Sequence, residues 1–172
     1  MKKTLLIAAL LCSSFAFAQK REKNGTIYKR HPYIDVIKSL ASLYQKGDAD
    51  GMTRYYADTV KFFGMSRYKV DSTMTRKRLS ENSKNLMEAK AGWQQIIDGW
   101  DIKMVFLDEP VGLEYANAQF AVQSWWELTL VNKKTKKTAV VQMVMLDIFN
   151  KDGKIGRQIQ CYDPTPLIIA MR

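Results

Sequence analysis

Apolar residues recur every three or four positions from Pro32 onward, which is the spacing of one face of a helix. Gly47 stands where such a helix would end. Asp48 and Asp50 follow as an N-cap and a first-turn acid for a second, shorter helix that continues through Tyr56. The pattern therefore predicts two consecutive helices at the start of the folded region.

A short strand over residues 60–63 and a third, strongly charged helix are expected next, the helix beginning near Thr73 or Thr75 and ending near Ala91. Beyond Gly92 the β-branched and aromatic residues predict four strands, at residues 99–107, 118–131, 138–149 and 154–162. The short polar connections between the last three strands have the composition of hairpin turns. Helices followed by an antiparallel meander are typical of the α+β class, with the helices on one face of a curved sheet. We expect residues 32–172 to form one such domain.

Residues 1–18 have the organisation of a cleavable signal peptide. A basic start precedes an apolar stretch, and Ala16 and Ala18 are the small residues that a signal peptidase reads. We therefore expect cleavage before Gln19 and export to the periplasm or the medium. The polar and basic residues 19–31 are expected to form a flexible arm.

No transmembrane segment is predicted in the mature chain. The apolar stretch of the signal peptide is shorter than the roughly 20 residues that cross a membrane, and no later segment is apolar for that long. Of the two cysteines, Cys161 alone follows the predicted cleavage site, so no intramolecular disulfide is expected.

The mature chain is basic. Without Lys2 and Lys3 it carries 25 Lys and Arg against 17 Asp and Glu, a net charge of +8. Export and the dispersed positions of these charges argue against nucleic acid as a partner. The cluster at residues 133–137 is explained by a solvated hairpin tip, and docking to an acidic polymer or membrane surface is the alternative.

Two pairs of short segments, taken in order and spacing, resemble the nuclear transport factor 2 superfamily, which includes SnoaL-like proteins and ketosteroid isomerases. They are Gly-Asp-Ala-Asp-Gly at 47–51 leading into 56–62, and Phe-Asn-Lys-Asp-Gly-Lys-Ile at 149–155 leading into Tyr162 and Asp163. The resemblance covers roughly residues 32–166. It implies a cone-shaped half-barrel, with a curved antiparallel or mixed sheet wrapped around about three helices and an apolar cavity open at one end.

The catalytic residues of ketosteroid isomerases are not matched at the corresponding positions of this sequence. Where the general base of ketosteroid isomerases would fall, this sequence has Phe62, Phe63 and Gly64. Where their second acid would fall, it has Met145, although Asp147 lies two residues further along the same face.

Alternation along residues 138–149 places a largely apolar set on one face of the strand, namely Val141, Met143, Met145, Asp147 and Phe149. The other face is also largely apolar and needs a cover. The family often supplies one by pairing the sheets of two subunits, so a homodimer is expected. Burial would raise the pKa of Asp147 and leave a neutral acid; the alternative is an acid near the strand end that pairs with a lysine or faces water.

Glu127 is the second candidate acid. It shares one strand face with Trp125, whereas Trp126 lies on the other, and either face is compatible with a cavity wall. Tyr55, Tyr56 and Tyr162 could each bring a hydroxyl group to a cavity acid. The candidate catalytic residues are Asp147 and Glu127, and the candidate ligand-binding residues are Tyr55, Trp125, Trp126, Met143, Met145, Phe149 and Tyr162.

No cofactor or metal site is predicted. His31 is the single histidine, and the chain has no glycine-rich phosphate loop, nucleophile elbow or Cys/His cluster. The preferred hypothesis is an exported binding protein that holds a small apolar or aromatic molecule. A cofactor-independent lyase, isomerase or hydrolase that uses cavity carboxylates is the second, and a dimeric adaptor for an acidic surface is the third.

Overall fold

The structure is a computed structural model that describes residues 23–66 and 83–172. The predicted signal peptide at residues 1–18 and the predicted start of the third helix near residue 73 lie outside these residues.

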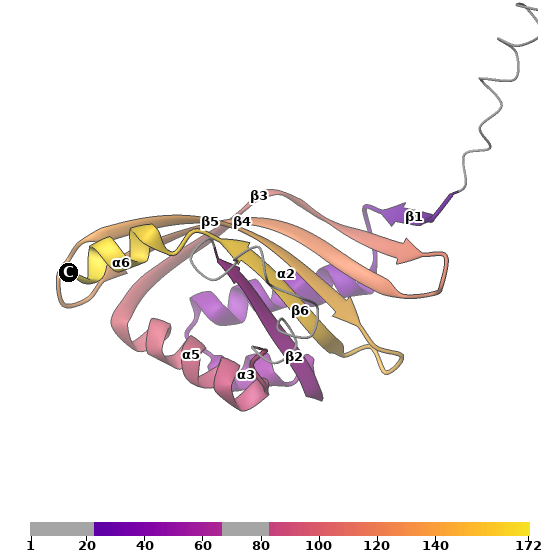
Figure 1. Cartoon of the computed structure of the whole chain (residues 1–172), viewed down its shortest axis with the longest axis horizontal. Coiled ribbons are helices and arrows are strands. Elements are labelled where there is room, and N and C mark those ends of the chain that lie inside the picture. Colours follow the sequence, from indigo (N-terminus) through magenta and orange to yellow (C-terminus); the bar gives the residue numbers. More distant parts are fainter. Residues whose placement is uncertain (1–22, 67–82) are drawn as a thin grey trace, which may run out of the picture.

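A six-stranded, strongly curved sheet organises the molecule, as Figure 1 shows. All neighbouring strands are antiparallel except β2 and β6, which run parallel. The strands, in the order in which they lie across the sheet, are β1 (Gly25–Tyr28), β3 (Trp100–Tyr115), β4 (Phe120–Asn132), β5 (Thr138–Phe149), β6 (Ile155–Tyr162) and β2 (Tyr56–Ser66).

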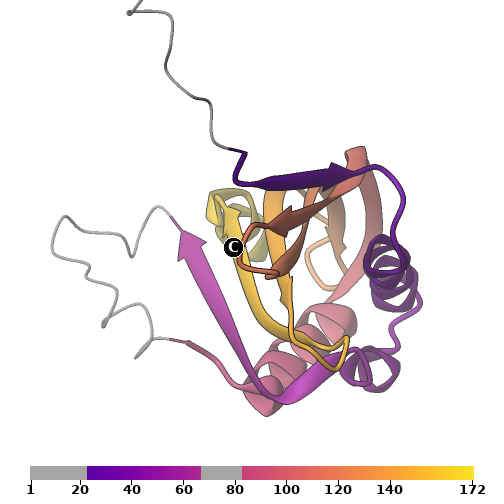
Figure 2. The same ribbon diagram turned by 90° about the vertical axis from the view of Figure 1, so that its right-hand side faces the viewer.

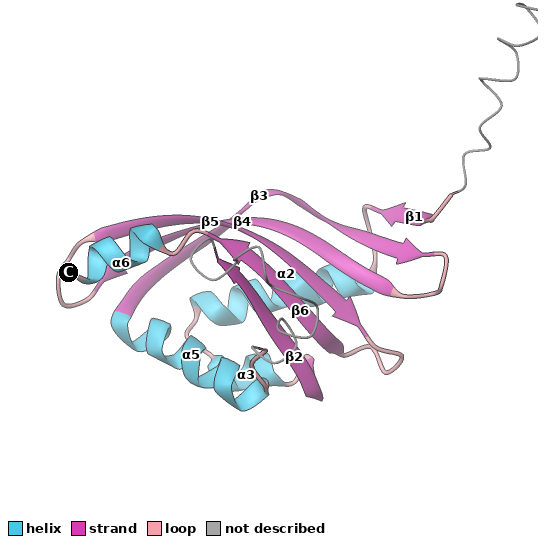
Figure 3. Cartoon of the chain, viewed as in Figure 1, coloured by secondary structure: helices cyan, strands magenta, loops and turns pink. Residues whose placement is uncertain are grey.

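Three helices lie on the concave side of the sheet: α2 (Pro32–Gln45), α3 (Ala49–Thr53) and α5 (Leu86–Gly99) (Figure 3). A fourth helix, α6 (Thr165–Met171), packs against β5 near the hairpin that joins β4 to β5, where the hydroxyl of Thr135 donates to the carbonyl oxygen of Ala170 at 2.8 Å. The predicted class, α+β with helices on one face of a curved sheet, is confirmed.

The helix starts follow from local side-chain chemistry. Pro32 occupies the first turn of α2, and the imidazole of His31 accepts a hydrogen bond from the backbone of Tyr33. The predicted N-cap of the second helix is present, since the carboxylate of Asp48 accepts from the backbone of Gly51 at 2.7 Å. A reciprocal capping box between Asn85 and Glu88 starts α5.

Several element boundaries differ from the prediction. The helix α3 ends at Thr53, so Tyr56 begins a strand that is much longer than residues 60–63. The helix α5 continues through Gly92 to Gly99, because a glycine inside a helix costs only about 1 kcal/mol and the faces around it are packed. The strand β3 extends past Pro110, where register shifts accommodate a residue that cannot donate to a sheet.

Part of the expected flexible arm is a strand. Residues 25–28 form β1, which pairs with Gly112–Tyr115 of β3 and lies along the sheet edge in Figure 2. Gly25 has φ +151°, and a Cβ atom there would lie 2.0 Å from the carbonyl oxygen of Glu114. The polar composition of this segment suits an exposed edge strand, which is why its pattern resembles that of a loop.

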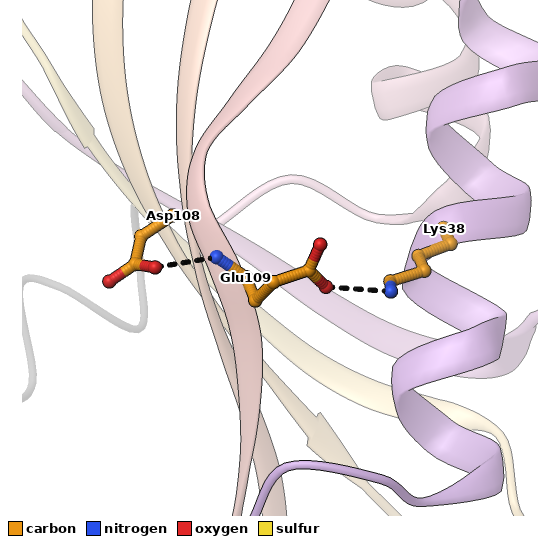
Figure 4. Close-up of polar contacts among 3 residues, drawn as sticks. All are labelled: Lys38, Asp108 and Glu109. Carbon is orange, nitrogen blue, oxygen red and sulfur yellow. Dashed lines mark hydrogen bonds and ion pairs between the residues drawn. The ribbon is translucent and has the colours of Figure 1, made fainter.

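The helix α2 is also tied to the irregular part of β3. The Nζ atom of Lys38 lies 2.7 Å from Oε2 of Glu109, and the backbone N–H of Glu109 donates to the neighbouring Asp108 carboxylate at 2.8 Å (Figure 4). Both partners of the ion pair are well exposed, so it contributes at most about 1 kcal/mol.

None of the helices in residues 23–66 and 83–172 is both long and apolar enough to cross a membrane.

Candidate functional site

A cavity of about 350 Å³ lies between the concave face of the sheet and the helices. Its walls are mainly apolar, and they include Leu40 of α2, Trp93 of α5, Trp126 of β4 and Met143 of β5. Leu167 of α6 adds to the lining at one end. A cavity of this size and composition suits a small ligand.

Asp147 is the one acid that the described part of the chain contributes to this lining, and its side chain is fully buried. Its Oδ1 atom accepts a hydrogen bond from Nε2 of Gln158 at 2.6 Å, whereas Oδ2 has no hydrogen-bond partner within residues 23–66 and 83–172. Burial raises the pKa of Asp147 to about 7, against the opposing effect of the Gln158 hydrogen bond. The structure therefore holds a carboxyl group that changes protonation state near neutral pH.

Gln158 connects Asp147 to a tyrosine. Its side chain is 2% exposed, and the same Nε2 atom donates to the hydroxyl oxygen of Tyr56 at 3.1 Å. Tyr56 is also buried, and burial together with the nearby Asp147 carboxylate raises the pKa of its hydroxyl well above the ordinary value. All three side chains line the cavity, so they form one continuous polar patch in a mainly apolar wall.

Strand pairing brings these three residues together. Asp147 of β5 lies directly opposite Gln158 of β6, and Tyr56 at the start of β2 pairs with Ile155 three residues before Gln158. Sequence reasoning identified Asp147 and considered the hydroxyl of Tyr56, but it missed Gln158. The short hairpin at residues 150–153 is the sequence feature from which Gln158 could have been predicted. A short turn fixes the register of β5 and β6 and so limits which β6 residues can lie opposite Asp147.

The predicted inner face of β5 lines the cavity, with Val141, Met143, Met145 and Asp147 all in the wall. On β4, the inner face is the one that carries Trp126, Leu128 and Leu130. Of the seven predicted ligand-binding residues, the structure places four in the cavity: Trp126, Met143, Met145 and Tyr162.

The other predicted site residues lie elsewhere. Trp125 is on the convex face and 44% exposed, and Glu127 shares that face, where it accepts a hydrogen bond from Gln142 at 3.3 Å. Phe149 stacks on Tyr33, with ring centroids 4.1 Å apart. Tyr55 lies beside Arg54, whose guanidinium donates to its hydroxyl at 3.2 Å. Glu127 and Asp147 therefore do not converge, because alternation along neighbouring strands turns them to opposite faces.

The remaining titratable groups that described residues contribute to the cavity are Tyr44, Tyr162 and Lys84. Burial, and secondarily Tyr162, raises the pKa of the Tyr44 hydroxyl, so it stays protonated at neutral pH. Lys84 is exposed, which shows that the cavity reaches the surface near this residue. Within residues 23–66 and 83–172 no group of three or more His, Cys, Asp or Glu side chains could hold a metal ion.

This arrangement can act in two ways on a bound molecule. In the neutral form, Asp147 can donate a hydrogen bond or a proton from Oδ2; in the ionised form, the same atom can accept one. The apolar walls exclude water and so strengthen either interaction.

Comparison with known proteins gives matches in structure alone. No protein-family model matches the chain, and no curated protein matches it in sequence. A candidate isomerase from Bacillus subtilis superimposes with a TM-score of 0.59 at 10% identity, over 80% of this chain and 90% of that one. AusH from Aspergillus nidulans matches with a TM-score of 0.58 at 11% identity, over 78% and 86% of the two chains. PrhC from Penicillium brasilianum matches with a TM-score of 0.58 at 13% identity, over 84% and 88%.

Identities this low show the fold alone. The match over most of each chain agrees with the curved, unclosed sheet and its helices, so the chain shares the predicted cone-shaped half-barrel fold with these proteins. A shared fold does not determine a shared reaction.

Proposed function

We propose that this protein binds a small, largely apolar molecule in its cone-shaped cavity and holds a polar group of that molecule at Asp147. The observation that carries the proposal is the Oδ2 atom of Asp147, a residue of the cavity lining. This atom is buried and has no hydrogen-bond partner among the described residues. Leaving a buried polar atom unpaired costs about 1–3 kcal/mol. A ligand that hydrogen-bonds to this atom offsets that cost, so the site favours occupancy.

Native mass spectrometry of protein purified from its own host tests this proposal. We expect a retained small molecule in the wild type and its loss in Met143→Trp, which fills the cavity from β5. Gln142→Trp is the matched control, because it adds the same side chain to an exposed position on the opposite face of that strand. If the wild type retains nothing and apolar fluorescent probes bind equally to all three proteins, the cavity is not a binding site.

A second candidate function is cofactor-independent acid–base catalysis, as an isomerase, lyase or hydrolase. It is favoured by one observation, the pKa of about 7 that burial gives Asp147, since a group titrating near the working pH is suited to move protons. Tyr56, and not Glu127, is the companion group that the geometry provides. Turnover of small carbonyl compounds, epoxides or hydroxylated compounds by the wild type, lost in Asp147→Asn, would support it. Retention of the unchanged ligand would favour binding.

Three further proposals concern the context of the domain. The order of the sequence segments and the cone fold support membership of the nuclear transport factor 2-like superfamily. The composition of residues 1–18 supports export to the periplasm or the medium. The apolar side chains exposed on the convex face of the sheet support a homodimer: Val105, Leu107, Trp125 and Val140 are each more than 40% exposed.

A further inference from the structure

The Gln158 side chain has an unusual position for a glutamine. It is almost fully buried on the cavity wall, and its amide nitrogen is within hydrogen-bond distance of both Asp147 and Tyr56. A primary amide has two N–H donors, which these two oxygen acceptors use completely. Gln160, two residues further along the same face, also lines the cavity but has no such contacts among the described residues.

These two bonds determine what the neighbouring groups can offer a ligand. Because Oδ1 of Asp147 accepts from Gln158, a proton on this carboxyl group is held at Oδ2. Because the oxygen of Tyr56 also accepts from Gln158, the hydroxyl proton of Tyr56 must point elsewhere, and no acceptor for it is present among the described residues. The Gln158 amide thus leaves the Tyr56 hydroxyl free to donate a hydrogen bond to a ligand. It also leaves Oδ2 as the oxygen of Asp147 that can interact with the ligand.

We propose that Gln158 is a positioning residue that presents Tyr56 and Asp147 to the cavity as a paired site for a hydroxyl group of the ligand. The hydroxyl oxygen accepts from Tyr56, and its proton is donated to Oδ2 of the Asp147 carboxylate. The inference rests on the proposed binding function and adds the class of ligand, an apolar or aromatic alcohol or phenol. The hydrogen bond that Gln158 donates to Oδ1 lowers the pKa of Asp147 and so favours the carboxylate form that this pairing needs.

Protonation of Asp147 removes the acceptor that this pairing uses for the hydroxyl proton of the ligand. Among the described residues, the other titratable groups that line the cavity are Tyr44 from α2, Tyr56 from β2, Tyr162 from β6 and Lys84, and the exposed Lys84 is the only cation in this set. Asp147 is the group in this set with a pKa of about 7. Affinity for a hydroxyl-bearing ligand should therefore rise with pH through neutrality, whereas a ligand that only accepts hydrogen bonds should gain nothing from the ionised form.

The positioning role is tested first without any ligand. The carboxyl carbon of Asp147 is followed by NMR as the pH is varied, with its signal identified by its loss in Asp147→Asn. We expect a midpoint near 7 in the wild type and an upward shift of about one pH unit in Gln158→Met, because the methionine no longer donates to the carboxylate. Gln160→Met is the matched control and should leave the midpoint unchanged.

The direction in which the Asp147 midpoint shifts shows whether the nitrogen or the oxygen of the Gln158 amide faces this carboxyl group. If the carbonyl oxygen of Gln158 faced Asp147, it would stabilise the neutral acid, and Gln158→Met would lower the midpoint. A lowered or unchanged midpoint overturns the proposal. Gln158→Asn, which retains the amide but withdraws it by one methylene, should shift the midpoint upward as well and covers the case in which the methionine variant does not fold.

The ligand class is then tested with 2-naphthol and 2-methoxynaphthalene, which differ in the hydroxyl proton. For 2-naphthol we expect about tenfold tighter binding at pH 8 than at pH 6, the ratio of the ionised fractions of a group that titrates near 7. This gain should be lost in Asp147→Asn, whereas Tyr56→Phe should weaken binding at both pH values. Equal pH dependence for the two probes overturns the hydroxyl assignment. Failure of both probes to bind, with the expected NMR shift in Gln158→Met, contradicts the binding function while leaving the positioning role intact.

Discussion

Asp147 affects folding as well as binding, because its ionisation differs between the folded and unfolded chain. Its pKa is about 7 in the folded protein and 3.8 for an unperturbed group. Between these two values the folded state holds the proton more tightly, so this residue makes the free energy of unfolding fall as the pH rises from about 4 to about 7. Above pH 7 the folded protein contains a buried carboxylate, and the resulting decrease in the free energy of unfolding no longer changes with pH.

Replacing Asp147 by asparagine should remove this pH-dependent cost. Asparagine has nearly the same shape, and its carbonyl oxygen can still accept from Gln158. We expect Asp147→Asn to be more stable than the wild type at pH 8, by at most about 4 kcal/mol, and the difference to shrink at pH 5. Urea unfolding of both proteins at the two pH values measures it, and an equal difference at both would show that Asp147 does not titrate as described.

The site could be predicted only in part because it depends on strand pairing. The alternation along β5 was enough to place Asp147 with Met143 and Met145 on one face. The same pattern on β4 could not decide between Trp125 and Trp126, since each face carries apolar and polar groups. Gln158 was missed because a glutamine has no ionisable group, and its importance follows only from the residue that it faces.

At the scale of elements, β1 shows how one glycine can determine whether a segment is ordered. The backbone of Gly25 has φ +151° and lies against the carbonyl group of Glu114, where a Cβ atom does not fit. This close approach lets a segment of four residues pair with the edge of β3.

We expect Gly25→Ala to detach β1 from the sheet. Amide hydrogen exchange in residues 25–28 should become fast, while protection in β4 and β5 stays as in the wild type. Gly64→Ala is the control, because a Cβ atom on this β2 residue would meet nothing within 4 Å. Retained protection in residues 25–28 would mean that β1 is held by contacts other than this backbone approach.

The element boundaries that were wrong share a physical cause. At each boundary, the packing of side chains in the folded protein outweighs the local sequence pattern. Tyr56 has the spacing of the preceding helix but is buried as the first residue of β2, and Gly92 looks like a helix end but lies inside α5. The hairpins and the strand β5 were predicted well because turn chemistry and alternation are local properties.

At the scale of the whole molecule, the cavity and the convex face have a common origin. The sheet is apolar on both faces of its central strands, and the helices of the described residues cover only the concave one (Figure 1). Curvature leaves a space beneath the sheet that the side chains of α2 and α5 do not fill. The cavity volume is the small difference between the volume that the sheet and helices enclose and the volume that their side chains fill. A residue pattern therefore predicts the cone but not the volume of its cavity.

The convex face should be buried in a homodimer. Trp125 lies on this face with Val105 and Val140, and all three are more than 40% exposed in the single chain. Pairing two such faces removes large apolar groups from water, each worth roughly 1.5–3 kcal/mol when fully buried. We expect the wild type to sediment as a dimer and Trp125→Asp as a monomer, because a charged group in the centre of the interface stays unpaired.

The control for this experiment is Ile169→Asp, which places the same charge at another exposed apolar position, on α6. It should remain dimeric if the interface is the sheet face. A monomeric wild type at high protein concentration would contradict the dimer, and a dimeric Trp125→Asp together with a monomeric Ile169→Asp would move the interface to α6. Because the cavity lies on the concave side, ligand binding should be retained in Trp125→Asp, so that subunit pairing and binding are separable properties of the two faces.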